Sequence, residues 1–356
     1  MQPLRVGVVG YGIAAQVMHL PFLTTMEEYK LVSILERHND LSKEKYPYAK
    51  IVRSIDEMVA DPSLDLVVIT TPNDTHFPFT EKALRAGKHV VLEKPFTITS
   101  EEGMALVELA NASKGKLSVF QNRRYVSDFL TVKKIIRENM LGEIVEYEAH
   151  YDRYRPEQKP NAWREKNIPG SGILYDLGAH LIDQALCLFG LPNSITADIR
   201  MQRPHAKVDD YFDLRLDYGF TRVILKSGML VREPGPRFMV HGRLGSFLKS
   251  GEDVQEAALK LGVLPVAPDW GSDPEDQWGL LHTEINGKII KEKYPSMQGS
   301  FGLYYKNLYK SLALGEPLRE KPEHGYNTIR IVELAMESSR KRATVDRYGL
   351  MNVDYP

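Results

Sequence analysis

The sequence predicts an α/β domain with a doubly wound parallel sheet, followed by an α+β domain with a mostly antiparallel sheet. Two observations lead to this prediction. Up to about residue 122, short runs that are apolar on both faces alternate with helical patterns, which is typical of parallel strands covered by helices. After residue 122, polar and apolar residues alternate with a period of two, which indicates strands with one solvated face. We therefore expect one domain over residues 1–122 and a second over residues 123–356.

Five buried strands are expected in the first domain, over residues 4–9, 31–36, 65–71, 89–93 and 117–121. Helix signals lie between these strands. Thr99 and Glu102 form a capping-box pair, which marks the start of a helix. Pro21 and Pro78 fall inside helical patterns, so these two helices should begin late or kink. The repeated alternation of strand and helix favours a doubly wound sheet.

The second domain is expected to be a sheet with helices on one face. Its strands are expected over residues 144–154, 194–201, 211–218, 222–226, 237–241, 246–249 and 280–284. Its helices are expected over residues 128–139, 172–189, 302–314 and 326–341. Residues 251–279 are rich in acidic residues and proline, and they are interpreted as a long ordered loop.

Composition narrows the classes of function. The chain has 46 Lys plus Arg against 47 Asp plus Glu, so it has no charge surplus for binding nucleic acid or an anionic membrane. Its one cysteine, Cys187, cannot form an internal disulfide or contribute to a cysteine-rich zinc site. The N-terminus shows no signal-peptide pattern, and no apolar run approaches the roughly 20 residues of a membrane span. A cytoplasmic protein with no metal site is therefore expected.

A glycine-rich loop follows the first strand and opens a helix. Residues 10–15 fit the pattern G-x-G-x-x-A, in which Gly10 makes the tight turn and Gly12 lets the backbone approach a pyrophosphate. Ile13 and Ala14 belong to the helix start, where the helix dipole favours the phosphate charge. Glycine can also serve such a turn for steric reasons alone. The strand, the helix and a later acidic residue favour a site for NAD or NADP.

That acidic residue is Glu36, at the end of the second strand, where a carboxylate can accept hydrogen bonds from both ribose hydroxyls of NAD. Arg37 follows directly, and its guanidinium could hold the 2′-phosphate of NADP. Alternatively, Arg37 and His38 are solvated turn residues. The choice between NAD and NADP stays open.

Two more motifs follow strands of the first domain. Thr71, Pro72, Asn73 and His76 come after the third strand of the five, at the carboxyl edge of the sheet, where doubly wound folds bind ligands. Asn73 and His76 could therefore face the cofactor, whereas Asp74 is at least as well suited to capping the next helix.

The fourth strand ends in the second of these motifs. Glu93 and Lys94 precede Pro95, whose ring restricts Lys94 to extended conformations. A lysine held in this way beside a nicotinamide can hydrogen-bond the oxygen that gains or loses a proton during hydride transfer. An isolated tripeptide of this kind would more often hold an exposed lysine.

Asp176 and His180 stand four residues apart in a helical pattern of the second domain, so they share one face of the helix. A neutral imidazole can take up a hydroxyl proton near neutral pH, and the carboxylate can orient the imidazole or bind a neighbouring hydroxyl. A surface pair without a catalytic role is the alternative. No third residue suitable as a metal ligand is evident.

Together these motifs resemble the glucose-fructose oxidoreductase and inositol dehydrogenase family, often called Gfo/Idh/MocA. The resemblance covers nearly the whole chain, through the glycine loop, residues 71–76, residues 93–95, and Asp176 with His180. Residues 121–125, 152–156, 163–165 and 175–177 are similar to the branch that contains bacterial scyllo-inositol dehydrogenases.

The resemblance implies a Rossmann domain that binds NAD or NADP, and a second domain whose open sheet forms the subunit interface of a homodimer or homotetramer. It implies catalytic roles for Lys94, Asp176 and His180, and it places Asn122 and Arg123 near the nicotinamide. Substrate contacts are expected from polar or aromatic side chains of the second domain, namely Arg124, Tyr154, Trp163 and Arg164.

We therefore expect an enzyme, an NAD(P)-dependent dehydrogenase that exchanges hydride with a ring hydroxyl or ketone of an inositol or sugar. An alternative is a lyase or glycosidase that retains NAD and oxidises its substrate transiently. A third is a dinucleotide-binding sensor without catalysis. The presence of Lys94, Asp176 and His180 together argues against the sensor.

Overall fold

The computed structural model describes residues 2–158 and 165–356, and these form two compact units. The first unit comprises the chain up to Asn122, together with Val254–Trp270 and Ser300–Tyr326. The second comprises Arg123–Asp253, Gly271–Gly299 and Asn327–Pro356. The first unit therefore includes two segments that come after the expected boundary at residue 122.

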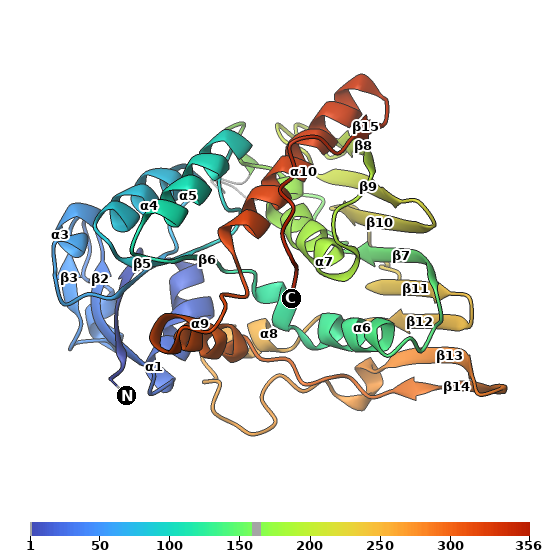
Figure 1. Ribbon diagram of the computed structural model, residues 1–356, viewed down its shortest axis with the longest axis horizontal. Helices are drawn as coiled ribbons and strands as arrows, with labels where there is room; N and C mark the ends of the chain where they lie inside the picture. The colour runs from blue at the N-terminus through green and yellow to red at the C-terminus, as the bar shows by residue number, and fades with distance from the viewer. Residues whose placement is uncertain (1, 159–164) are drawn as a thin grey trace. The chain divides into compact units, whose positions relative to one another are not determined.

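The first unit contains a six-stranded sheet in the order β3-β2-β1-β4-β5-β6, and every neighbouring pair is parallel (Figure 1). The strands are β1 (Leu4–Val9), β2 (Tyr29–Leu35), β3 (Lys50–Val52), β4 (Leu66–Ile69), β5 (His89–Leu92) and β6 (Leu117–Val119). The strand order reverses between β1 and β4, so the sheet is doubly wound, as predicted. The edge strand β3 was not predicted, because three residues are too few to show a period.

Helices and short helical turns complete the first unit, and all but the last two connect these strands. They are η1 (Ala14–His19), α1 (Leu20–Thr25), α2 (Ser42–Lys45), α3 (Ile55–Val59), η2 (Asn73–Thr75), α4 (His76–Arg85), α5 (Ser100–Ala112), α8 (Gln255–Lys260) and α9 (Gly302–Leu314). The predicted capping box at the start of α5 is present, with Thr99 and Glu102 as its members. Pro21 and Pro78 lie in the first turns of α1 and α4, where a helix does not need their missing N–H groups. Helix α8 interrupts the stretch that was interpreted as a long loop.

The second unit contains a nine-stranded sheet in the order β14-β13-β12-β11-β7-β10-β9-β8-β15. Its strands are β7 (Ile144–His150), β8 (Ser194–Arg200), β9 (Tyr211–Tyr218), β10 (Thr221–Gly228), β11 (Phe238–Gly242), β12 (Gly245–Lys249), β13 (Gly279–Ile285), β14 (Lys288–Tyr294) and β15 (Val345–Asp346). All neighbours are antiparallel except β7 and β10. The predicted α+β class with a mostly antiparallel sheet is confirmed.

One face of this sheet is covered by helices, as Figure 1 shows for α6 (Ser127–Arg137), α7 (Ala179–Phe189) and the later part of α10 (Pro322–Lys341). Strand β9 shows the alternation that follows from this arrangement. Phe212, Leu214 and Leu216 are buried, whereas Asp213 and Arg215 between them form an ion pair on the other face.

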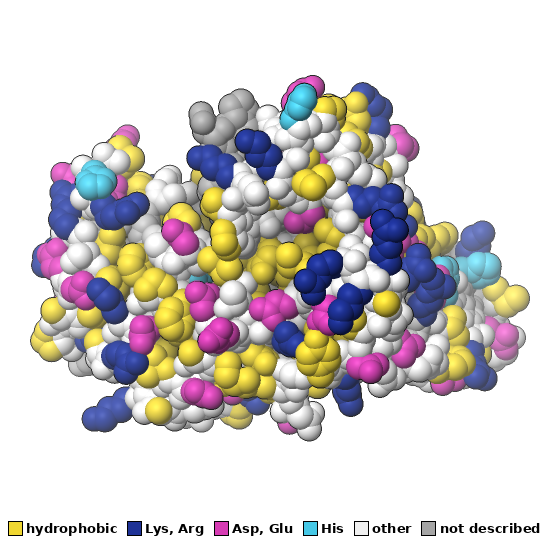
Figure 2. Space-filling model, turned by 90° about the horizontal axis from the view of Figure 1, so that it is seen from above, with side chains coloured by type: hydrophobic (Ala, Val, Ile, Leu, Met, Phe, Trp, Pro, Cys, Tyr) yellow, Lys and Arg dark blue, Asp and Glu magenta, His cyan; other side chains and the backbone are white. Residues whose placement is uncertain are grey.

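The surface agrees with the balanced composition. Acidic and basic side chains are interspersed over the face of the molecule that Figure 2 displays. None of the described helices is both long enough and apolar enough to cross a membrane.

Candidate functional site

The glycine loop after β1 has the backbone geometry that the pattern requires. Gly10 has a φ of 94°, and a Cβ there would lie 3.0 Å from Cγ2 of Thr71. Only glycine meets both demands without strain. A Cβ on Gly12, by contrast, would meet no atom within 4 Å, so open space lies above this residue. The loop is thus tight on the sheet side at Gly10 and open at Gly12, where a pyrophosphate needs access.

A cavity of about 480 Å³ adjoins the loop and is lined by Tyr11, Gln16, Leu41, Glu44 and Lys45. Its aromatic ring, apolar side chain and polar groups are the mixture that an adenosine half requires. The residues present therefore fit a dinucleotide.

Glu36 has a structural role beside the one expected of it. Its carboxylate is buried, with 7% of the residue exposed, and it accepts hydrogen bonds from two backbone N–H groups. The N–H of Ser42 lies 2.8 Å from one carboxylate oxygen, and the N–H of Leu41 lies 3.1 Å from the other. Glu36 therefore caps the start of helix α2, and each oxygen keeps one lone pair for a further donor.

The loop between β2 and α2 is held by Arg53, whose guanidinium donates to the carbonyl oxygens of Glu36 at 2.8 Å and Asn39 at 2.7 Å. Arg37 and His38 protrude from this fixed loop, and both are exposed. The side chains of Arg37 and His38 therefore extend into solvent from a loop whose backbone is held in place by Arg53.

His76 was expected to face the cofactor, but its side chain is buried and lies between two turns of the carboxyl edge. Its ring nitrogens are 2.8 Å from the carbonyl oxygen of Pro95 and 2.9 Å from that of Thr71. Burial lowers the pKa of His76, and the two carbonyl acceptors oppose this shift, because only the protonated ring can donate to both. It acts as a strut that joins the turn after β4 to the turn after β5. Asn73 is also buried, in the short helix η2.

Glu93 and Lys94 follow β5 at the same edge. Glu93 is 9% exposed, and one of its oxygens accepts the backbone N–H of Lys94 at 3.0 Å. The other oxygen lies 2.9 Å from Nε2 of His19. Although burial opposes ionisation, the hydrogen bond with His19 and the nearby charge of Lys94 hold the pKa of Glu93 below its ordinary value. Glu93 is therefore an ionised, buried carboxylate next to the expected catalytic lysine.

In the second unit, Asp176 lies in a π-helical turn, η5 (Leu174–Gly178), and His180 lies in the first turn of α7 directly after it. π-Helical turns are rare and often occur at functional sites. His180 is 6% exposed, and its ring centroid is 6.2 Å from that of Tyr151.

Asp209 was missed by the sequence analysis and supports this helix from a distant part of the chain. Its carboxylate accepts the N–H of Leu174 at 2.7 Å, at the first residue of η5. Gly172 makes room for it, because a Cβ there would lie 1.9 Å from Oδ1 of Asp209. Burial raises the pKa of Asp209 to about 6. No local pattern reveals this contact.

The residues that were expected to contact the substrate differ in their exposure and in their partners. Arg124 is 5% exposed and donates to both carboxylate oxygens of Asp183, at 2.7 Å and 2.6 Å. This guanidinium therefore helps to fix α7, and the substrate-binding role of Arg124 stays a prediction. Tyr154 is 42% exposed, with the guanidinium of Arg232 3.9 Å from its ring centroid. Trp163 and Arg164 lie outside the described residues.

Asn122 and Arg123 begin a short helical turn, η3 (Asn122–Tyr125), after β6. Asn122 is buried, and the carbonyl oxygen of Arg123 accepts a hydrogen bond from Nε2 of Gln184 at 2.8 Å.

The described residues contain no group of three or more His, Cys, Asp or Glu side chains that could hold a metal ion.

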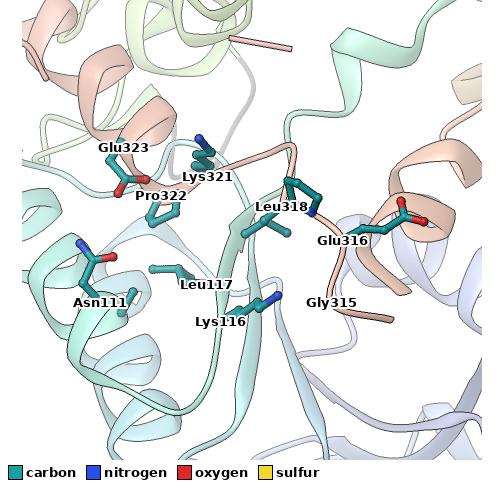
Figure 3. A pocket seen from close by; sticks show the side chains of 11 residues that line it. Asn111, Lys116, Leu117, Gly315, Glu316, Leu318, Lys321, Pro322 and Glu323 are labelled. Atoms are coloured by element: carbon teal, nitrogen blue, oxygen red, sulfur yellow. The ribbon is translucent and has the colours of Figure 1, made fainter. Parts of the chain in front are cut away.

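A second cavity, of about 360 Å³, lies at the amino end of β6, away from the carboxyl ends of the strands that carry the glycine loop (Figure 3). Its lining includes Lys116 and Leu117 at the amino end of β6, and Leu318 and Pro322 from the segment after α9. The glycine loop, Thr71 and Lys94 all follow the carboxyl ends of strands. This cavity is therefore separate from the expected dinucleotide site.

Comparison with known proteins gives the family. Residues 4–121 match the family model described as "Oxidoreductase family, NAD-binding Rossmann fold", and residues 133–346 match the one described as "Oxidoreductase family, C-terminal alpha/beta domain". The first model is named GFO_IDH_MocA and the second GFO_IDH_MocA_C, and together they cover most of the chain.

Similar proteins extend over nearly the full length. The scyllo-inositol 2-dehydrogenase (NADP(+)) IolW of Bacillus subtilis is 43% identical over 343 residues, covering 96% of this chain and 95% of the relative. The uncharacterized oxidoreductase YdgJ of Escherichia coli is 41% identical and covers 96% of this chain and 98% of the relative. The solved structure of the putative oxidoreductase yvaA from Bacillus subtilis has a TM-score of 0.94 at 42% identity, covering 97% of this chain and 99% of that one. The chain therefore belongs to the Gfo/Idh/MocA family and is an NAD(P)-dependent oxidoreductase.

Proposed function

We propose that this enzyme is a dehydrogenase that oxidises one ring hydroxyl of an inositol or sugar to a ketone, or catalyses the reverse reaction. The observation that carries the proposal is the presence of Lys94 and His180 in a chain that is 43% identical, over 96% of its length, to a scyllo-inositol 2-dehydrogenase. An ammonium group and a neutral imidazole are the groups that alcohol oxidation needs.

In the proposed mechanism, a nicotinamide held by the first unit would supply the acceptor for the hydride that leaves the carbon bearing the hydroxyl. His180 takes the hydroxyl proton, and Lys94 donates a hydrogen bond to the same oxygen as the carbonyl forms. Asp176 orients the imidazole or binds a neighbouring hydroxyl. The alcohol loses two electrons and two protons in total, of which the nicotinamide receives both electrons and one proton, and His180 receives the other proton.

We further propose that NADP is preferred over NAD. Both oxygens of Glu36 already accept backbone N–H groups, so fewer of their lone pairs are left for the ribose hydroxyls of NAD. Arg37 is exposed on the same fixed loop, and its guanidinium suits a 2′-phosphate. The relative IolW is named as an NADP(+) enzyme, which supports this choice.

The test is the absorbance of reduced nicotinamide with purified enzyme, NAD or NADP, and a panel of inositols, aldoses and uronic acids. Turnover of one polyol, with a higher kcat/KM for NADP than for NAD, is expected. Lys94→Ala and His180→Ala should each lower kcat by roughly 10²- to 10⁴-fold, the usual size of an acid–base contribution. Full turnover in either variant would contradict the assignment of that residue.

Failure of the whole panel would favour the other two hypotheses. If the dinucleotide binds but no polyol is oxidised, this result would support the hypothesis of a lyase or glycosidase that retains NAD. Glycosides would then be the next substrates to test. Binding without any chemistry would favour a sensor.

We also propose a homodimer or homotetramer that associates through the uncovered face of the nine-stranded sheet. This face carries alternating charges such as Asp213 and Arg215, which can pair across an interface. Light scattering coupled to size-exclusion chromatography would report the subunit number, and a monomer would contradict the proposal. A cytoplasmic location is proposed with it.

A further inference from the structure

A row of hydrogen bonds crosses the interior of the first unit and ends at Lys94. His19 is completely buried, with Nδ1 2.6 Å from the hydroxyl of Tyr305 and Nε2 2.9 Å from a carboxylate oxygen of Glu93. The other oxygen of Glu93 accepts the backbone N–H of Lys94 at 3.0 Å. The ring of Phe120 closes the array, with its centroid 4.2 Å from that of His19.

The contact with Glu93 fixes one proton of this array. The ionised carboxylate of Glu93 can only accept hydrogen bonds, so Nε2 of His19 must donate. Burial raises the pKa of Tyr305 well above its ordinary value, so its hydroxyl keeps its proton. That hydroxyl can donate to Nδ1 or accept from it, so its contact supports the ring in either case.

The position of His19 in the chain gives this array a functional direction. His19 is the last residue of η1, the helix whose first turn follows the glycine loop. Glu93 directly precedes Lys94 at the end of β5. The hydrogen bond between His19 and Glu93 therefore connects the helix that is expected to hold the pyrophosphate with the residue that is expected to act on the substrate.

Loss of the hydrogen bond between His19 and Glu93 would cost more free energy than loss of an ordinary hydrogen bond. Glu93 is 9% exposed, so solvent cannot replace a lost partner. Leaving a buried carboxylate short of a donor costs the desolvation energy of a charged group, which is larger than the net gain of an ordinary hydrogen bond. The carboxylate would respond by rotating or by taking up a proton, and both changes would alter the setting of Lys94.

We propose that His19 is a positioning residue, whose Nε2–H group holds the carboxylate of Glu93 and thereby fixes Lys94 for catalysis. The inference rests on the proposed function, because Lys94 is catalytic only in that reaction. The interaction between Nδ1 and Tyr305 is a support for the ring and is not needed for the chemistry.

Two amide variants separate the two ring nitrogens. The amide of His19→Gln reaches the position of Nε2 and can still donate to Glu93, whereas that of His19→Asn reaches only the position of Nδ1. Both remove the imidazole and leave a neutral polar side chain in the same buried site. We expect kcat to fall roughly 10- to 100-fold in His19→Asn, as expected for a displaced catalytic group, and to stay within a few-fold of wild type in His19→Gln. The KM for NADP should change little in either variant.

Tyr305→Phe is the matched control, because it removes the hydrogen bond at Nδ1 and leaves the pair with Glu93 intact. Its turnover should stay close to that of wild type. Equal losses of kcat in His19→Gln and His19→Asn, or no loss in either, would overturn the proposal. Should His19→Asn fail to fold, as judged by circular dichroism, Glu93→Gln changes the same pair from the other side and should lower kcat by a similar factor.

A second readout does not depend on the substrate. Labelling of Lys94 by trinitrobenzenesulfonate can be followed by mass spectrometry of the peptide that contains it. If the hydrogen bond between His19 and Glu93 fixes Lys94, the rate of labelling of Lys94 should change several-fold in His19→Asn and stay at the wild-type rate in His19→Gln. Equal labelling of all three proteins would contradict the role of His19. If wild type oxidises no polyol, the proposed function fails, but this comparison still tests the array.

Discussion

The carboxylate of Asp209 accepts a hydrogen bond from the backbone N–H of Leu174 at 2.7 Å, and so caps the helical segment that carries Asp176 and His180. Burial raises the pKa of Asp209 to about 6, because the ionised form is poorly solvated there. A folded-state pKa above that of the unfolded chain means that the protonated acid is favoured by folding. The stability contributed by this group is therefore complete below about pH 4 and is lost as the pH rises through 6.

Asp209→Asn should remove this pH dependence, because an amide does not titrate and its oxygen can still accept the N–H of Leu174. The stability of the variant relative to wild type should rise by on the order of 2 kcal/mol between pH 4 and pH 7. Chemical denaturation at several pH values measures this difference. Parallel curves for the two proteins would show that Asp209 does not titrate in this range.

Gly172 should not tolerate a side chain. It has a φ of 91°, and a Cβ would lie 1.9 Å from Oδ1 of Asp209. Gly172→Ala should therefore destabilise the protein by about 1–3 kcal/mol and lower kcat, since the cap on η5 must move. Gly190→Ala is a suitable control, because its φ of 71° is similarly strained but a Cβ there would meet no atom within 4 Å. A similar kcat in both variants would argue that the contact with Asp209 is unimportant for catalysis.

Arg37→Ala should weaken NADP and leave NAD almost unchanged. Loss of a charge-assisted hydrogen bond to the 2′-phosphate should raise the dissociation constant of NADP roughly 10- to 100-fold. Fluorescence titration with the reduced cofactors measures both constants. Equal effects on the two cofactors would indicate that Arg37 has no contact with the 2′-phosphate.

Glu36→Gln tests the other half of the same interpretation. The variant replaces one carboxylate oxygen with an NH2 group, which cannot accept a backbone N–H, so the hydrogen bond from either Ser42 or Leu41 is lost. We expect a loss of stability of about 1–3 kcal/mol with an unchanged ratio of NAD to NADP affinity. A selective loss of NAD binding would restore Glu36 as a ribose ligand.

Arg124→Met should act on stability rather than on substrate affinity. It leaves Asp183, which is 2% exposed, as a buried carboxylate without its bidentate partner. Removing one member of such a pair costs about 3–5 kcal/mol. The double variant Arg124→Met with Asp183→Leu should recover a large part of this loss, and thermal unfolding of the three proteins checks the expectation. A raised KM with unchanged stability would return Arg124 to the substrate site.

Local patterns predicted the elements of the fold and the turn geometry of the glycine loop. The alternation of strand and helix is a property of neighbouring residues, and the requirement for glycine at position 10 follows from a single tight turn. Strand β14 was missed, although Asn286 and Gly287, both with positive φ, form the kind of turn that joins two hairpin strands. That signal was available in the sequence.

Contacts between residues that lie far apart in the sequence cannot be predicted from a local pattern. The capping role of Glu36 was not predicted because its partners are backbone N–H groups of a loop whose conformation the sequence does not display. Arg124 and Asp183 are 59 positions apart, and His19 and Glu93 are 74 positions apart. Each of these side chains has an ordinary exposed role when considered alone. Only the fold shows which carboxylate meets which cation or imidazole.

The π-helical turn between Leu174 and Gly178 has a consequence for comparing this chain with its relatives. A π turn accommodates about one residue more than an α turn, so a relative lacking one residue at 177 or 178 could keep a continuous helix. Each residue advances an α-helix by about 100°, so the aspartate and histidine of such a relative would stand three residues apart, on one face of the helix but turned relative to each other. A single-residue gap at this place in an alignment would therefore mark a protein whose aspartate and histidine approach the substrate from a different angle.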